Sequence, residues 1–111
     1  MAYNKDLADR VDAILNEFAT PNTVGKKMFG GVGYLINGNM ACGVLGDLFI
    51  VRVGKDAYED ALARRETSPF DTTGRPMTGW VFVDPGLLGE SKSMADWLRQ
   101  GVDFALSLPP K

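Results

Sequence analysis

The feature that most constrains the fold is a change of periodicity, because apolar side chains recur with a period of two between residues 27 and 53. Asn37-Gly38 marks a turn in this segment, since both central positions of a type I′ turn need a positive φ, which asparagine and glycine tolerate. Gly46-Asp47 marks a second turn. The two turns predict three strands that pair as an antiparallel meander.

Two-residue loops at these turns decide which side chains share a face of the sheet. They place Ile36 opposite Asn39 and Leu45 opposite Leu48. Both faces are then mostly apolar, and the second face carries Val32, Tyr34, Ile36, Ala41, Leu45, Leu48 and Ile50, with Arg52 beside Ala41 and near Tyr34. A sheet with one solvated face alternates apolar with polar residues, so we expect a loop, a bound ligand or another subunit to cover this second face. A bulge at the glycines of the first strand would shift the register.

Helical periodicity is found at both ends of the chain and once in between. Residues 4–18 form an amphipathic pattern with Asn4 as its N-cap, and residues 20–27 are interpreted as the loop into the sheet. Residues 54–66 predict a second helix of about three turns, and residues 91–106 predict a third.

The order of these elements defines a fold class. Residues 67–79 are rich in turn formers and are interpreted as an irregular or edge segment, followed by a strand that ends at Pro85. The predicted order is helix, three strands, helix, one or two strands and helix, in one domain that spans residues 1–111. Strands paired by hairpins favour an α+β fold of two layers, an antiparallel sheet with the helices packed on one face.

The glycine-rich stretch "GGVGYLING" fails both common fingerprints of phosphate-binding loops. The P-loop needs GxxxxGK[ST], and no lysine followed by serine or threonine comes after these glycines. The dinucleotide fingerprint needs GxGxxG between a strand and a helix, whereas this stretch runs into a hairpin turn and another strand. We interpret the glycines as shaping the sheet and expect no cofactor.

Composition narrows the function. The net charge of −2 disfavours a protein that binds nucleic acid by unspecific phosphate neutralisation. The chain contains no histidine, which removes the commonest general base, the Ser-His and Cys-His nucleophile systems and the commonest zinc ligand. It has no apolar run long enough for a bilayer and no secretory signal, so we expect a cytoplasmic protein without a membrane partner. Cys42 is expected to be a small buried thiol.

The candidate partner contacts are mainly cationic. Lys26 and Lys27 are ordinary solvated charges at the start of the sheet, or they form a basic patch for an anionic partner together with Arg52 and Arg75. If an anion binds there, Tyr34 is expected to lie near it.

Arg52 is the least ordinary of these residues, because "LFIVRVG" surrounds it with apolar side chains. A half-buried arginine normally has an acidic or carbonyl partner. Asp71 and Asp84 are candidates for a structural ion pair, and ligand binding is the alternative. Trp80 and Trp97 are interpreted as core anchors with a polar edge.

Three stretches of the sequence, "KKMFGGVGYLINGNMACGV", "FIVRVGKDAYEDAL" and "PFDTTGRPMTGWVFVDP", are followed by a closing helix that ends in "SLPP". Together they closely resemble the N-terminal domain of the TfoX/Sxy competence regulators, over nearly the whole chain. The most specific parts are residues 27–31, Arg52 in its strand and residues 74–80. The resemblance implies a two-layer α+β domain with an antiparallel sheet, akin to the secretion-chaperone-like folds.

For function, the resemblance implies regulation and no defining enzymatic activity. Full-length regulators of this family promote expression of DNA-uptake genes, acting with the cyclic-AMP receptor protein at its promoters. They also carry a C-terminal helical domain, so we expect this chain to be a stand-alone version of the N-terminal unit, to which control of competence does not transfer directly. The family has no common catalytic residues to transfer, and Arg52 and Arg75 are shared without an assigned role.

Two functional hypotheses from different classes remain. The first is a non-enzymatic regulatory or protein-interaction module, a homodimer that associates through the apolar second face. It would meet an acidic protein partner, such as the transcription machinery, with Lys26, Lys27, Arg52 and Arg75, and direct contact with nucleic acid is left open. The second is a binder of a small anionic ligand, held by Arg52 and Arg75 near Tyr34.

Overall fold

The computed structural model describes residues 3–18, 23–28, 30–71, 77–89 and 91–110. Its helices are α1 (Lys5–Glu17), α2 (Tyr58–Leu62) and α3 (Ser91–Leu106), with a short 3₁₀ helix, η1 (Pro85–Leu87). Its strands are β1 (Thr23–Met28), β2 (Gly31–Ile36), β3 (Asn39–Leu45), β4 (Leu48–Arg52), β5 (Thr67–Pro69) and β6 (Trp80–Val83).

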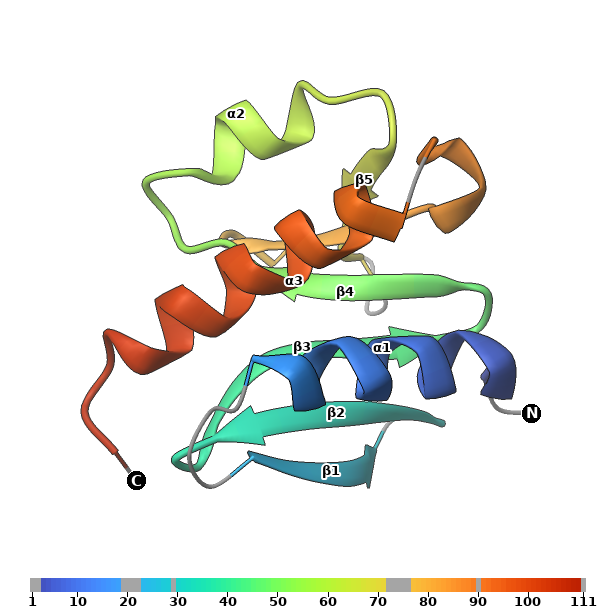
Figure 1. Ribbon diagram of the computed structural model, residues 1–111. Helices are drawn as coiled ribbons and strands as arrows, with labels where there is room; N and C mark the ends of the chain where they lie inside the picture. Colours follow the sequence, from blue (N-terminus) through green and yellow to red (C-terminus); the bar gives the residue numbers. More distant parts are fainter. Residues whose placement is uncertain (1–2, 19–22, 29, 72–76, 90, 111) are drawn as a thin grey trace.

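The six strands form one antiparallel sheet in the order β1-β2-β3-β4-β6-β5. Helices α1 and α3 lie across one face of this sheet, and α2 packs near β5 and β6 (Figure 1). The predicted α+β fold of two layers, with helices on one face of an antiparallel sheet, is confirmed. Within the described residues, no helix is long and apolar enough to cross a membrane.

Helices α1 and α3 lie where the sequence predicted them, whereas α2 is shorter. Asn4 caps α1, since its side chain accepts the backbone N–H of Leu7 at 3.1 Å. Val11 and Leu15 lie one turn apart on the buried side of this helix. In contrast, α2 has only five residues, and Ala57 at its N-cap offers no side-chain oxygen to the first N–H groups.

A strand lies where the sequence predicted a loop. Residues 23–28 form β1, an edge strand that pairs with β2 after the chain reverses at Gly30, whose φ is 78°. The predicted loop over residues 20–27 is therefore wrong from Thr23 onward, and residues 20–22 lie outside the described part. Apolar alternation is weak in β1 because its lysines and glycine, at the edge of the sheet, remain exposed to solvent.

The hairpin turn and the pairings beside both turns are confirmed. Asn37 and Gly38 have φ angles of 54° and 84°, as a type I′ turn requires. The predicted pairs are both present, Ile36 with Asn39 and Leu45 with Leu48.

One extra residue in β3 changes which side chains of β2 and β3 lie on the same face of the sheet. Leu35 pairs with Met40, whereas Tyr34 pairs with Cys42, so that Ala41 is the additional residue of a bulge. Because side chains alternate along a strand, one extra residue moves the remainder of β3 to the opposite faces relative to β2. The faces assigned from an unbroken register to β2 and to Met40 were therefore wrong, whereas Leu45, Leu48, Ile50 and Arg52 share one face as predicted.

Tyr34 and Ile36 belong to the core beneath the helices as a result. The hydroxyl of Tyr34 donates to the backbone oxygen of Ala8 in α1 at 3.2 Å. Burial, with a smaller contribution from the nearby carboxylate of Asp12, raises the pKa of Tyr34 to about 12. The prediction that placed Tyr34 on the second face, near Arg52, was wrong.

We call the side of the sheet away from the helices the open face. Strand alternation and pairing assign to it Leu35, Met40, Leu45, Leu48, Ile50, Arg52, Trp80 and Phe82. Phe70 covers part of it, with its ring centroid 5.1 Å from that of Phe82 and 6.2 Å from that of Trp80. Association of two copies through this face stays a prediction, which light scattering of the purified chain can test.

Helix α3 lies directly against the sheet at Gly101. A Cβ at this position would clash with the carbonyl oxygen of Ala41, and it would lie 3.2 Å from Cγ1 of Val51. The neighbouring Leu98 and Val102 are fully buried. Cys42, next to the bulge, is also fully buried, and burial raises the pKa of its thiol to about 12, so the predicted buried thiol is confirmed.

Gly101→Ala is expected to lower the free energy of unfolding by about 1–3 kcal/mol, because overpacking against the backbone outweighs the roughly 1 kcal/mol that alanine gains in a helix. Gly89→Ala is the matched control, since a Cβ there meets nothing within 4 Å. It is expected to change stability by less than about 0.5 kcal/mol. Urea denaturation measures both variants, and a Gly101→Ala protein as stable as the wild type would contradict close seating of α3 on β3.

Candidate functional site

Arg52 and Trp80 lie side by side at one end of the open face. Arg52 is the last residue of β4 and pairs with Trp80, the first residue of β6. Directly opposite residues of paired strands point to the same face of a sheet. Both side chains are half-buried there, so the guanidinium is partly withdrawn from water.

One carbonyl and two aromatic rings surround this guanidinium. Nη1 of Arg52 donates to the backbone oxygen of Met40 at 3.3 Å. Cζ of Arg52 lies 5.0 Å from the ring centroid of Trp80 and 5.3 Å from that of Phe104. Rings at such distances attract a cation through their quadrupole. The carbonyl partner that the sequence allowed for Arg52 is therefore present.

The predicted carboxylate partners do not neutralise Arg52. Asp84 instead accepts the backbone N–H of Gly86 at 2.9 Å, and Asp71 is exposed. In the part of the chain that the structure describes, no carboxylate lies within ion-pair distance of Arg52. An arginine has five N–H donors, and among the described residues the carbonyl of Met40 is the one acceptor that Arg52 contacts, which leaves donors for an anion.

A hollow of about 390 Å³ opens beside the guanidinium. We call it the Arg52 hollow. Gly54, with a φ of 85°, follows β4 in its wall, and a Cβ there would lie 2.5 Å from Cε1 of Phe104. Only glycine allows this backbone conformation and the packing of Phe104 against it. The carbonyl of Gly79 accepts hydrogen bonds from the N–H groups of Val53 and Gly54 at 2.8 and 3.1 Å. These bonds connect this wall to the residue that precedes β6.

The walls of the Arg52 hollow combine charge with apolar surface. Its charged side chains are Arg52, Lys55 and Asp56, and its larger apolar ones are Val53, Trp80 and Phe104. A planar guanidinium in a partly desolvated setting suits a carboxylate or a phosphate, which it can bind through two parallel hydrogen bonds. Within the described ranges, no group of three or more Cys, Asp or Glu side chains could hold a metal ion. The arrangement is suited to holding an anion.

Lys26 and Lys27 do not join Arg52 in one patch. They lie on β1, which two other strands separate from β4, and three strand spacings amount to roughly 14 Å. Alternation directs the two lysines to opposite faces of the sheet. Lys27 borders a different hollow, between β1 and α1, together with Asp9 and Asp12.

Tyr34 and Arg75 are the other predicted contacts. Tyr34 borders the same hollow as Lys27 and is absent from the walls of the Arg52 hollow. Arg75 lies outside the described residues, so the structure does not place it. Of the predicted contacts that the structure describes, Arg52 alone lies at the Arg52 hollow.

Of the residues that line this hollow, Arg52 alone was predicted as a site residue, and Lys55, Trp80 and Phe104 are among those that were not. Trp80 was interpreted as a core anchor, and only the pairing of β4 with β6, which no local pattern reveals, brings it to Arg52. Phe104 did leave a signal, since it follows Gly101 by three residues and Trp97 by seven and so lies on the same side of α3. A large aromatic residue on that side needs a contact with the sheet or with the loops at its end.

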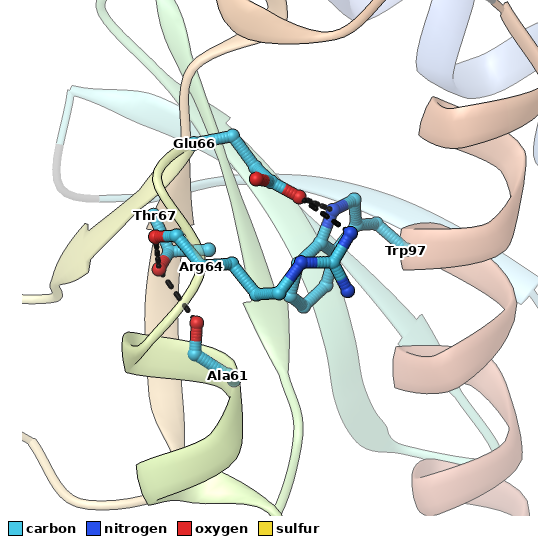
Figure 2. Close-up of polar contacts among 5 residues, drawn as sticks. All are labelled: Ala61, Arg64, Glu66, Thr67 and Trp97. Carbon is cyan, nitrogen blue, oxygen red and sulfur yellow. Dashed lines mark hydrogen bonds and ion pairs between the residues drawn. The ribbon is translucent and has the colours of Figure 1, made fainter.

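A second polar cluster joins the chain after α2 to α3 (Figure 2). The buried carboxylate of Glu66 accepts the indole N–H of Trp97 at 3.1 Å and lies 3.0 Å from Nη2 of Arg64. The hydroxyl of Thr67 lies 2.6 Å from the carbonyl oxygen of Ala61. Because all buried side-chain nitrogens and oxygens of the described residues have partners, we interpret this cluster as structural. The prediction that Trp97 is a core anchor with a polar edge is confirmed.

Fold and hollow together define a small α+β domain that presents a half-buried arginine at one end of an antiparallel sheet. The family model described as the TfoX N-terminal domain matches residues 14–105, which include all six strands and nearly all of α3. The chain belongs to the TfoX N-terminal domain family, as its sequence motifs implied. Searches of curated proteins and of solved structures gave no match.

Glu66→Ala is expected to lower the free energy of unfolding by about 1–3 kcal/mol, since the buried indole N–H of Trp97 loses its acceptor. Glu66→Gln keeps an acceptor oxygen and loses the ion pair with Arg64, whose side chain is 62% exposed. Its expected loss is below about 1 kcal/mol. Urea denaturation followed by tryptophan fluorescence measures both variants, and equal losses would assign the stabilisation to the ion pair.

Proposed function

We propose that this chain is a non-enzymatic regulatory module that acts by binding a protein partner, and that the Arg52 hollow receives an anionic group of that partner. The observation that carries the proposal is the half-buried guanidinium of Arg52, which has two aromatic neighbours and no carboxylate partner among the described residues. Partial withdrawal of a cation from water is costly. An anion supplied by a partner would offset that cost.

The non-enzymatic part of the proposal draws on composition and on the family. The chain has no histidine, so it lacks the side chain most often used for general acid and base catalysis near neutral pH. The chain belongs to the TfoX N-terminal domain family, and its resemblance to the TfoX/Sxy regulators implies no defining enzymatic activity. A binding role needs only the hollow and its cation.

A protein partner is favoured over nucleic acid because the cations are dispersed. The net charge of the chain is −2, and two strands separate the lysines of β1 from β4, which carries Arg52. Strong contact with a phosphate backbone normally uses several cations in a row. As a narrower proposal, the chain takes part in regulating the transcription of DNA-uptake genes. Membership of the family is the only support for this role.

Affinity capture from native cell lysate tests the proposal, with the wild-type chain, Arg52→Ala and the control Arg65→Ala as baits. Arg65 is exposed and follows α2, so its truncation matches the charge change at Arg52 without touching the hollow. We expect Arg65→Ala to recover the same partner as the wild type after nuclease treatment. Arg52→Ala is expected to recover at least about tenfold less, the loss that one charge-assisted hydrogen bond accounts for.

Two results of the capture experiment would contradict the proposal. If Arg52→Ala recovers the partner as well as the wild type does, the Arg52 hollow is not the contact. If nuclease removes the partner, the interaction depends on nucleic acid.

A small-molecule role is the second candidate, favoured by the size and shape of the hollow. Its volume of about 390 Å³ falls in the range of ligand pockets, and its walls are partly aromatic. This role predicts that a small organic anion alone raises the melting temperature and that Arg52→Ala abolishes the increase. Thermal denaturation against a panel of carboxylates, phosphates and sulfates measures this, and a panel without any stabilising anion would count against the role.

A further inference from the structure

We propose that the group received by the Arg52 hollow is a carboxylate on an acidic side chain that lies between apolar residues of a partner polypeptide. This inference rests on the proposed function and names the chemistry of its partner. The argument uses the charge of the hollow, the geometry of the guanidinium and the apolar character of the walls.

The charge around the hollow fits one negative charge better than two. Among the described residues of its walls, Arg52 and Lys55 contribute two positive charges and Asp56 contributes one negative charge, which leaves a net charge of +1. A carboxylate carries one negative charge, whereas a phosphate on a serine, threonine or tyrosine side chain carries about 1.5 to 2 at neutral pH. The carboxylate of Asp56 would repel the more highly charged group more strongly.

A nucleic acid strand fits less well because it carries a charge at every nucleotide. Such a strand is normally bound along a row of cations. Lys26 and Lys27, the adjacent pair of lysines, lie on β1, and two strands separate them from Arg52. The acidic side chains Asp9 and Asp12 lie near Lys27 and weaken the field of that part of the surface.

The guanidinium of Arg52 is held in a position that leaves donors for a planar anion. One nitrogen, Nη1, donates to the carbonyl of Met40, and the rings of Trp80 and Phe104 limit its movement. A carboxylate matches the fork of the remaining N–H groups in plane and spacing. Because the side chain is already positioned, little conformational entropy is lost on binding.

The apolar walls of the hollow favour a partner segment in which apolar residues flank the acidic one. Val53, Ala57, Trp80 and Phe104 line the hollow around the charged groups. A hydrated acidic segment would leave these surfaces in contact with water, whereas apolar residues on both sides of the acid would cover them. The recognised element is therefore an acidic residue in an apolar context, not a run of acidic residues.

Heteronuclear NMR titration tests the inference, because the chain has two tryptophans and therefore two indole N–H signals. Trp80 borders the Arg52 hollow, and Trp97, bonded to Glu66, reports on a distant part of the fold. The probes are acetyl-Leu-Asp-Phe-amide, the matched acetyl-Leu-Asn-Phe-amide, inorganic phosphate and a single-stranded oligonucleotide. The proteins are the wild type, Arg52→Lys, Arg52→Ala and the control Arg65→Ala.

We expect the aspartate peptide to shift the Trp80 signal in a saturable manner and to leave the Trp97 signal unchanged. The asparagine peptide is expected to bind at least about tenfold more weakly, since it lacks the charge that strengthens the hydrogen bonds. Arg52→Lys and Arg52→Ala are expected to weaken binding of the aspartate peptide by a similar factor, while Arg65→Ala retains it. The comparison between the two peptides uses the wild-type protein alone and is independent of how well the variants fold.

Three outcomes would overturn the inference: equal binding of the two peptides, no shift of the Trp80 signal with the aspartate peptide, or tighter binding of phosphate or the oligonucleotide. The proposed function fails separately, when a captured partner is recovered equally by the wild type and by Arg52→Ala. The two experiments can also disagree. If the captured partner depends on Arg52 but the aspartate and asparagine peptides bind equally well, the proposed function stands and the carboxylate is rejected as the recognised group.

Discussion

The close approach of α3 to the sheet is the constraint on which the other features depend. Gly101 rests on the carbonyl of Ala41, the extra residue of the β3 bulge, and a side chain there would force the two apart. Residues three and four apart on a helix lie on the same side. The contact at Gly101 therefore positions the residues one turn away on each side. Trp97, one turn before Gly101, reaches Glu66, and Phe104, one turn after it, packs against Gly54. The polar cluster and one wall of the Arg52 hollow both depend on this contact.

Features that a few neighbouring residues decide could be predicted from the sequence. The Asn37-Gly38 turn, the N-cap Asn4 and the limits of α3 follow from local conformational preferences and from helical spacing. The strand β1 could not be predicted in this way, because an edge strand has little apolar surface to bury and its lysines resemble those of a loop. The bulge at Ala41 lies against Gly101 of α3, a contact between residues far apart in the sequence that no local pattern contains.

In the candidate site, too, local features could be predicted from the sequence and long-range contacts could not. Arg52 was identified because apolar neighbours on both sides of a cation are unusual in a strand. The aromatic residues around Arg52 were not identified, because Trp80 and Phe104 reach it through strand pairing and helix packing between parts of the chain that are far apart in sequence. Tyr34 was misplaced for a related reason, because a shift of one residue moves a side chain to the opposite face of the sheet. Errors in register thus affect a predicted site more than they affect a predicted fold.

The position of Arg52 is hard to explain by stability alone. A half-buried cation loses hydration, and one carbonyl and two aromatic rings replace only part of it. An apolar residue of similar volume would pair with Trp80 and cover the same surface without that loss. The Glu66 cluster shows that this chain can match a buried charge with an indole N–H and a charge of opposite sign. A guanidinium without a carboxylate among the described residues, beside a hollow, is therefore the feature on which we base the proposal of a bound anion.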